Sequence, residues 1–181
     1  MGRVAVFIDG GYLQKVLQDE FGFRRINFGK LAKSLAGDRE ILRAYYYTCE
    51  PYQSNPPTAE ESERFSRSQK FLYALEQLPR FEVRLGKLAY RGRDERGRPI
   101  LQQKRVDIQM GVDLVLLATK NQITDAVIVA GDSDFVPAID AAKPEGVVIH
   151  LFHGADPHTD LVSRCDERTR ITESFVDSVR L

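Results

Sequence analysis

The sequence predicts one α/β domain, a three-layer Rossmann-like sandwich with a mainly parallel central sheet of about five strands flanked by helices. Short apolar runs alternate along the chain with segments whose apolar residues recur at helical spacing. Strands separated by helices need crossover connections, which join parallel neighbours. The chain has 181 residues, enough for one full core, and shows no repeat, low-complexity tract or linker. We therefore expect residues 1–181 to form a single domain.

The first half of the chain predicts two strands and three helices. Gly37 is expected to end the second helix, because glycine readily follows a helix C-terminus. Thr58 and Glu61 form a capping-box pattern that opens the third helix. The expected strands are residues 4–8 and 41–48, and the expected helices are residues 12–19, 30–35 and 58–78.

The second half begins with a hairpin-like segment and then resumes the alternation. Asp94 to Gly97 supplies turn chemistry between two β patterns. Pro144 and Gly146 close the helix that follows the 125–130 run. The expected strands are residues 81–85, 87–90, 100–105, 125–130 and 147–152; the expected helices are residues 108–119, 135–142 and about 159–165, with a tail near 170–176.

Composition excludes several broad classes. The formal net charge is zero, so any attraction to nucleic acid must come from a local patch. Cys49 and Cys165 lie far apart and form no CxxC motif, which favours a reducing, cytoplasmic setting. The apolar runs are too short to span a membrane, and the first ends in an acid rather than a signal cleavage site, so no membrane partner is expected.

Acidic residues follow two of the predicted strands and open one predicted helix. Asp132 and Asp134 come after the 125–130 strand, Asp9 ends the first strand, and Asp107 precedes the 108–119 helix. Ligands of open α/β sheets bind at the carboxyl ends of the strands. Carboxylates crowded at that edge repel unless a cation lies between them, and Mg²⁺ takes such oxygen ligands. The sequence therefore predicts a metal site built from three segments.

The stretches Val6-Phe-Ile-Asp9-Gly10, Lys104-Arg-Val-Asp107 through Asp113, and Ala130-Gly-Asp-Ser-Asp-Phe-Val-Pro137 resemble the NYN domain family. This family belongs to the PIN-like nucleases, and the chain looks most similar to its LabA-like branch, from residue 4 to about 165. The resemblance implies a PIN-like sandwich and a ribonuclease that depends on Mg²⁺ or Mn²⁺. It also implies RNA as the partner and cleavage that leaves a 5′-phosphate and a 3′-hydroxyl.

Roles carry over to matching positions. Asp9 and Asp132 are expected to hold the metal most directly, and Asp107 and Asp134 to complete the site. Ser133 could form a hydrogen bond with a metal-bound water or with a phosphate oxygen. Asp113 lies about 120° around and roughly 9 Å along the helix from Asp107, so we expect it behind the site or near the substrate path.

A local basic patch is the candidate substrate surface. Residues 80–105 hold nine basic and three acidic side chains, a local charge of +6, and are expected to form a hairpin insertion. Tyr12 replaces the asparagine that is usual in the family's first motif. The expected contacts to RNA are Lys104, Arg105, Arg91, Arg93 and Tyr12, with the tyrosines at 45–47 nearby.

Other interpretations stay open at this point. Asp132 and Asp134 could only cap a helix, and the basic hairpin could be a solvated loop. The alternatives to a nuclease are a non-catalytic domain that binds RNA or protein, and another phosphoryl-transfer enzyme such as a phosphatase. His150, His153 and His158 fit no zinc spacing well. The natural RNA, endo- or exonucleolytic action, preference for RNA over DNA, the number of metal ions and assembly as a homodimer are undetermined.

Overall fold

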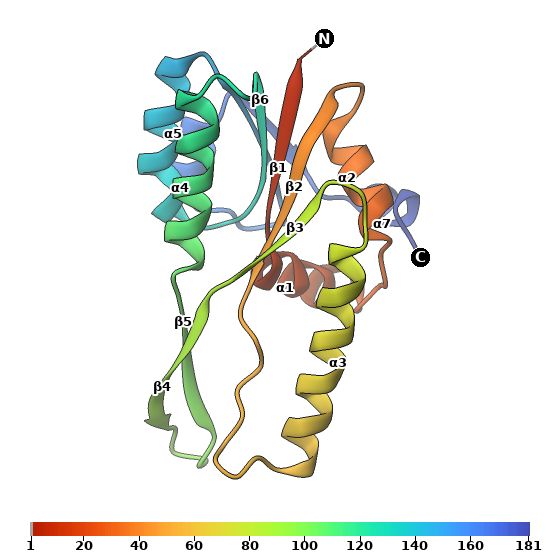
Figure 1. Cartoon of the computed structure of the whole chain (residues 1–181), viewed down its shortest axis with the longest axis vertical. Helices are drawn as coiled ribbons and strands as arrows, with labels where there is room; N and C mark the ends of the chain where they lie inside the picture. The colour runs from red at the N-terminus through yellow and green to blue at the C-terminus, as the bar shows by residue number, and fades with distance from the viewer. Residues whose placement is uncertain (1) are drawn as a thin grey trace.

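A six-stranded sheet forms the centre of the protein, with every neighbouring pair of strands parallel (Figure 1). The structure is a computed structural model that describes residues 2–181. The spatial order is β3-β2-β1-β6-β7-β8. The strands are β1 (Arg3–Asp9), β2 (Glu40–Thr48), β3 (Phe81–Leu85), β6 (Asp125–Val129), β7 (Val148–His153) and β8 (Glu167–Arg170).

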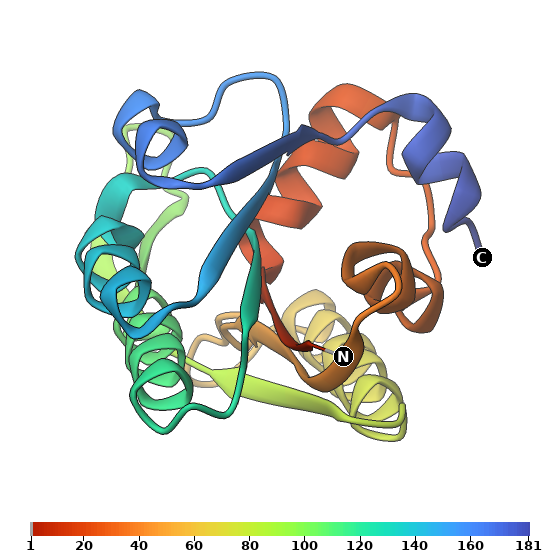
Figure 2. The same ribbon diagram turned by 90° about the horizontal axis from the view of Figure 1, so that it is seen from above.

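Helices cover both faces of this sheet and make a three-layer sandwich (Figure 2). Because side chains alternate along a strand, Val4 and Val6 pack against one layer and Ala5 and Phe7 against the other. One layer holds α1 (Gly10–Phe21), α2 (Phe28–Ala36), α3 (Ala59–Glu76) and α7 (Glu173–Ser178); the opposite layer holds α4 (Val106–Thr119), α5 (Val136–Ala142) and α6 (Thr159–Arg164).

The expected α/β class and parallel sheet are confirmed, and the boundaries of most elements agree with the sequence patterns. Gly37 follows α2, and Thr58 and Glu61 form both hydrogen bonds of the capping box that opens α3. The sixth strand, β8, lies where the sequence predicts only a tail. Its four residues are all exposed and polar, so they carry no apolar pattern, and pairing with β7 alone makes this segment a strand.

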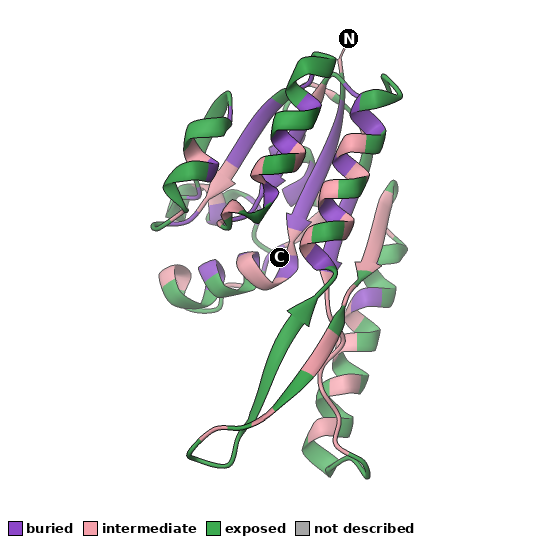
Figure 3. Cartoon of the chain, turned by 90° about the vertical axis from the view of Figure 1, so that its left-hand side faces the viewer, coloured by how far each residue is buried: buried purple, intermediate pink, exposed green. Residues whose placement is uncertain are grey.

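The basic segment divides between two sheets. Residues Phe81–Leu85 pair with β2 in the central sheet, so the hairpin itself is shorter than the expected 80–105. It consists of β4 (Lys87–Arg93) and β5 (Pro99–Lys104), which pair antiparallel around a turn at Asp94. Figure 3 shows this largely exposed hairpin projecting beyond the buried sheet. No helix among the described residues is long and apolar enough to cross a membrane.

Candidate metal and substrate site

Asp9 and Asp132 lie at the carboxyl edge of the sheet because their strands are neighbours. The register of β1 and β6 places Ile8 beside Val129, one residue before Asp9. Asp9 also begins α1, where its Oδ1 accepts a hydrogen bond from the Tyr12 backbone N at 3.0 Å. Burial raises the pKa of Asp9, and the negative charges of Asp107 and Asp132 raise it further, against the hydrogen bond from Tyr12.

Asp107 brings the third segment to the same place. It lies in the first turn of α4, and its pKa is raised by burial and then by the charges of Asp132 and Asp134. Asp132 precedes the 3₁₀ turn η1 (Ser133–Phe135), and its Oδ1 accepts a hydrogen bond from the Asp134 backbone N at 3.2 Å. The capping role is therefore real, and it coexists with crowding among the four acids.

Among residues 2–181, none of these four carboxylates forms an ion pair. The ion pairs of the described residues lie elsewhere, for example at Asp125 and Asp166. In the same part of the chain, no three His, Cys, Asp or Glu side chains stand close enough to enclose a metal ion as they are. The donor set still fits a hydrated Mg²⁺ or Mn²⁺, because such ions bind through a few carboxylate oxygens and keep several waters.

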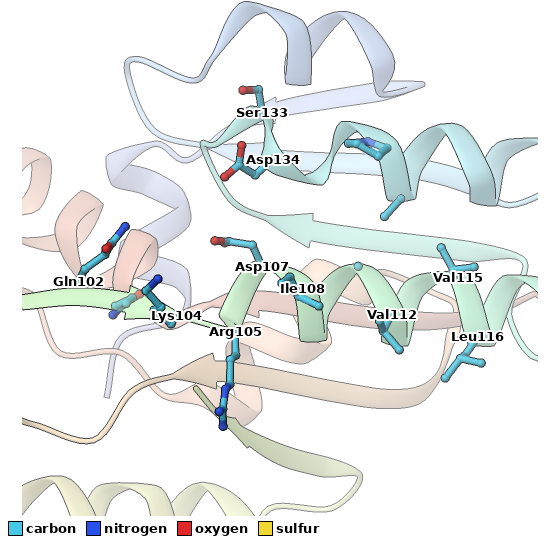
Figure 4. A pocket seen from close by; sticks show the side chains of 14 residues that line it. Gln102, Lys104, Arg105, Asp107, Ile108, Val112, Val115, Leu116, Ser133 and Asp134 are labelled. Atoms are coloured by element: carbon cyan, nitrogen blue, oxygen red, sulfur yellow. The ribbon is translucent and has the colours of Figure 1, made fainter. Parts of the chain in front are cut away.

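Two hollows meet at the carboxylates. Asp9 and Asp132 line a polar hollow of ≈ 610 Å³, and Asp107 and Asp134 line a groove of ≈ 800 Å³ between α4 and α5. Gln103 of the hairpin lines both. Figure 4 shows Asp107 and Asp134 on facing elements at one end of the groove, with Ser133 on the far side of Asp134 from Asp107. The site is thus open on two sides.

Tyr12 supports the loop that carries Asp132. A Cβ on Gly131 would lie 2.2 Å from the Tyr12 ring, so glycine is required there for the ring to pack against the loop. The Tyr12 hydroxyl accepts a hydrogen bond from the Gly154 backbone N at 2.8 Å. Tyr12 also lines the polar hollow, but its hydroxyl is already engaged within the protein.

Asp113, which the sequence places behind the site or near the substrate path, is engaged with residues of β2 and β3. Its Oδ2 accepts hydrogen bonds from the Tyr47 hydroxyl at 2.8 Å and from Arg84 Nε at 3.1 Å. It therefore ties α4 to β2 and β3. Tyr45, Tyr46 and Tyr47 are likewise core residues.

The residues expected to contact RNA differ in how their side chains lie relative to the acids. Lys104 lines the groove with Asp107, whereas the Arg105 side chain extends away from Asp107 and Asp134 (Figure 4). Arg91 Nε donates to Gln102 Oε1 at 3.1 Å, and Arg93 donates to the Gly97 carbonyl at the tip of the hairpin. The hairpin proper holds six basic and two acidic residues, a local charge of +4.

Sequence reasoning missed four side chains at the polar hollow. Lys15 of α1, Gln103 of β5, Asp156 and His158 all line it with Asp9. His158 is held there because its backbone N donates to the Gly131 carbonyl at 2.9 Å. Lys15 lies six residues after Asp9 on α1, a spacing that does not by itself point to the site, and His158 comes from a distant loop; neither carries a local signal.

The fold and the acidic edge define a class: an α/β sandwich of the PIN-like type, with carboxylates gathered at the carboxyl ends of parallel strands. The chain belongs to the NYN domain family, whose model matches residues 3–172. The fold is similar to that of a crystal structure of a protein of unknown function from Vibrio parahaemolyticus, with a TM-score of 0.68 and 16% identity over 99% of this chain and 96% of that chain. No curated protein matches the sequence.

Proposed function

We propose that this protein is a Mg²⁺- or Mn²⁺-dependent ribonuclease that hydrolyses phosphodiester bonds. The observation that carries the proposal is the gathering of Asp9, Asp107, Asp132 and Asp134 at one sheet edge, with none of the four in an ion pair among the described residues. By contrast, Asp113 and Asp125 pair with Arg84 and Arg39. Membership of the NYN family supports the nuclease class. A cytoplasmic setting is part of the proposal and accords with two free cysteines.

Asp9 and Asp132 would hold the metal most directly, with Asp107 and Asp134 completing its surroundings. The bound ion would neutralise charge on the scissile phosphate and favour attack by water. Ser133 lies beside Asp134 and would donate to a phosphate oxygen. In the hydrolysis, water adds to phosphorus and the 3′ oxygen departs as a hydroxyl, leaving a 5′-phosphate on the other fragment.

The chain's own basic residues would hold the RNA. Lys104 lines the same groove as Asp107 and would contact the phosphate next to the cleaved bond. Arg91 and Arg93 extend this positive surface along the hairpin. Exposed basic side chains on a projecting hairpin bind a polyanion without sequence selectivity, and such binding weakens steeply with salt.

The decisive experiment replaces one acid without changing its shape. With Mg²⁺ or Mn²⁺, Asp132→Asn should lower cleavage of a fluorescent RNA by about 100-fold or more, because the carboxylate charge that holds the ion is removed. RNA affinity, measured by fluorescence anisotropy, should stay within about threefold. Asp38→Asn is the matched control, since Asp38 is exposed, forms no ion pair among residues 2–181 and lies before β2, at the opposite end of the strands from Asp9 and Asp132.

The competing function is a non-catalytic RNA-binding domain. The observation that favours it is the lack, among residues 2–181, of three metal-binding side chains already in place. If the purified protein binds RNA but cuts none with either metal, the catalytic proposal fails and this alternative stands. An assay with a small phosphomonoester, run beside the RNA assay, separates a nuclease from a phosphatase.

A further inference from the structure

The hairpin carries an aromatic ring that the fold leaves half in solvent. Tyr90 of β4 is 49% exposed, although its ring stacks on that of Tyr52 with the ring centroids 5.8 Å apart and the planes 16° apart. Tyr52 belongs to the loop between β2 and α3, which runs beside the hairpin (Figure 1). This Tyr52–Tyr90 stack therefore leaves aromatic surface free for another flat group.

The loop that carries Tyr52 is held in place by α3. Arg64 Nη2 donates a hydrogen bond to the Tyr52 carbonyl at 3.3 Å, and Glu61 Oε2 accepts one from the Ser54 backbone N at 3.1 Å. A hollow of ≈ 260 Å³ lies beside Tyr52. The stack is thus a supported surface with space beside it, and a ligand that binds it orders little of the protein.

The register of the hairpin places Tyr90 on the face that reaches the acidic site. Tyr90 pairs with Leu101, and Leu88 pairs with Gln103, which lines both hollows at the carboxylates. Paired residues, and residues two apart along a strand, share one face. Tyr90 therefore lies on the same face as Gln103 and one pair further out, roughly 7 Å along the strand. A polynucleotide held at the carboxylates can continue along this face to the ring.

The opposite face of the hairpin supplies positive charge. Of the described residues, Arg98 and Asp94 form the one ion pair that involves the hairpin, at its turn. The exposed Lys87 and Arg91 of β4 form none, and they lie on the face opposite Tyr90. Because paired strands are only about 5 Å apart, phosphates along the edge of this ribbon can reach these cations while a base lies on the ring. Cations beside an exposed aromatic ring bind single strands of nucleic acid in this way.

We infer that the Tyr52–Tyr90 stack is a subsite that binds one unpaired base of the RNA, close to the acidic cluster. The base lies on the free surface of Tyr90, and Tyr52 supports the ring from its other side. The subsite rests on the proposed function, because RNA is the polyanion that the acids and the hairpin share. Every base has a flat aromatic face, so the subsite adds affinity for unpaired strands without selecting a sequence.

Binding measured in EDTA, where no metal-dependent cleavage occurs, tests the subsite apart from catalysis. The probe is a labelled RNA of about 12 nucleotides without self-complementarity, followed by fluorescence anisotropy. Tyr90→Ala should weaken its binding about fivefold or more, because the ring on which the base stacks is lost. Tyr90→Phe keeps the ring and should bind as the unaltered protein does. Tyr73→Ala is the matched control, since Tyr73 is 66% exposed on α3, outside the hairpin.

A strand that carries phosphates but no bases tests the stacking itself. An abasic strand of the same length, and a duplex of the same sequence, should bind Tyr90→Ala and the unaltered protein within about twofold of each other, because phosphate contacts remain and no unpaired base is offered. Equal affinity of Tyr90→Ala and the unaltered protein for the single-stranded RNA overturns the inference. So does an equal loss with the abasic strand or the duplex, since the ring would then only shape the basic surface, and so does an unaltered protein that binds no RNA. Loss of binding to RNA alone in Tyr90→Ala, in a protein that cuts nothing with Mg²⁺ or Mn²⁺, would keep the subsite and refute only the catalytic proposal.

Discussion

Replacing Gly131 by alanine should destabilise the protein through a single steric conflict. The added Cβ would lie 2.2 Å from Tyr12 Cε2, whereas carbon atoms in contact prefer about 3.5–4.0 Å. The ring or the loop must therefore move by more than about 1 Å. The Tyr12 ring cannot turn away without losing a hydrogen bond, because its hydroxyl accepts one from the Gly154 backbone N at 2.8 Å.

Overpacking of this kind costs about 1–3 kcal/mol. For a chain of 181 residues, about 2 kcal/mol corresponds to a fall in melting temperature of roughly 4–8 °C. Urea unfolding followed by circular dichroism measures the free energy of unfolding directly. Gly29→Ala is the control: its Cβ would meet Asn27 Oδ1 at 3.3 Å, a contact that a shift of a few tenths of an ångström relieves, so the loss of stability should be much smaller than for Gly131→Ala.

A double-mutant cycle identifies Tyr12 as the obstacle. In a Tyr12→Ala background, Gly131→Ala should cost less than about 0.5 kcal/mol, because the clash is gone. Equal losses in both backgrounds would refute this explanation, and so would a Gly131→Ala protein as stable as the original. The same shift should move Asp132, so the variant should also lose metal-dependent cleavage if the proposed function is correct.

Three further predictions concern residues outside the acidic cluster. Asp113→Ala should lower the free energy of unfolding by about 2 kcal/mol, because Arg84 and the Tyr47 hydroxyl lose their hydrogen-bond partner. A variant that stays fully stable but no longer cleaves RNA would instead place Asp113 in the site. Burial tends to raise the pKa of Asp125, but hydrogen bonds from Thr124, His150 and Arg39 outweigh it and lower this pKa. The ionised carboxylate therefore stabilises the fold above about pH 4, and this stabilisation is lost as the pH falls through the folded pKa. Asp125→Asn should make the free energy of unfolding, measured by urea titrations at acid pH, less dependent on pH, and an unchanged pH dependence would contradict the shift. Burial raises the pKa of the Cys165 thiol to about 11, so iodoacetamide should label it far more slowly in the folded protein than in urea, as mass spectrometry can measure; equal rates would refute its burial.

The candidate site was largely predictable because its acids sit at the ends of elements. Asp9 and Asp132 each follow a fully apolar run, and a parallel sheet brings the carboxyl ends of neighbouring strands to one edge. Asp107 opens a helix that begins at the same edge. The local sequence pattern and the geometry of parallel sheets are therefore enough to predict that these acids lie at one edge, independently of the proposed chemistry.

The role of Asp113 was not predictable, because its partners are remote. Tyr47 is 66 positions away in the chain and Arg84 is 29 away, and nothing near Asp113 signals either. The contact between Tyr12 and Gly131 was not predictable for the same reason, because the two residues are far apart in the chain. A side chain's spacing along a helix tells which face it lies on, but not what covers that face.

By itself, the sequence determined the helices, the buried strands and the acidic ends of β1 and β6, because burial periodicity and capping are local properties of the chain. Only the tertiary structure decided which segments pair. It made the exposed, polar Glu167–Arg170 a sixth strand, and it placed Phe81–Leu85 in the central sheet rather than in the hairpin. Backbone pairing at a sheet edge needs a neighbouring strand more than an apolar pattern, and that neighbour exists only in the folded chain.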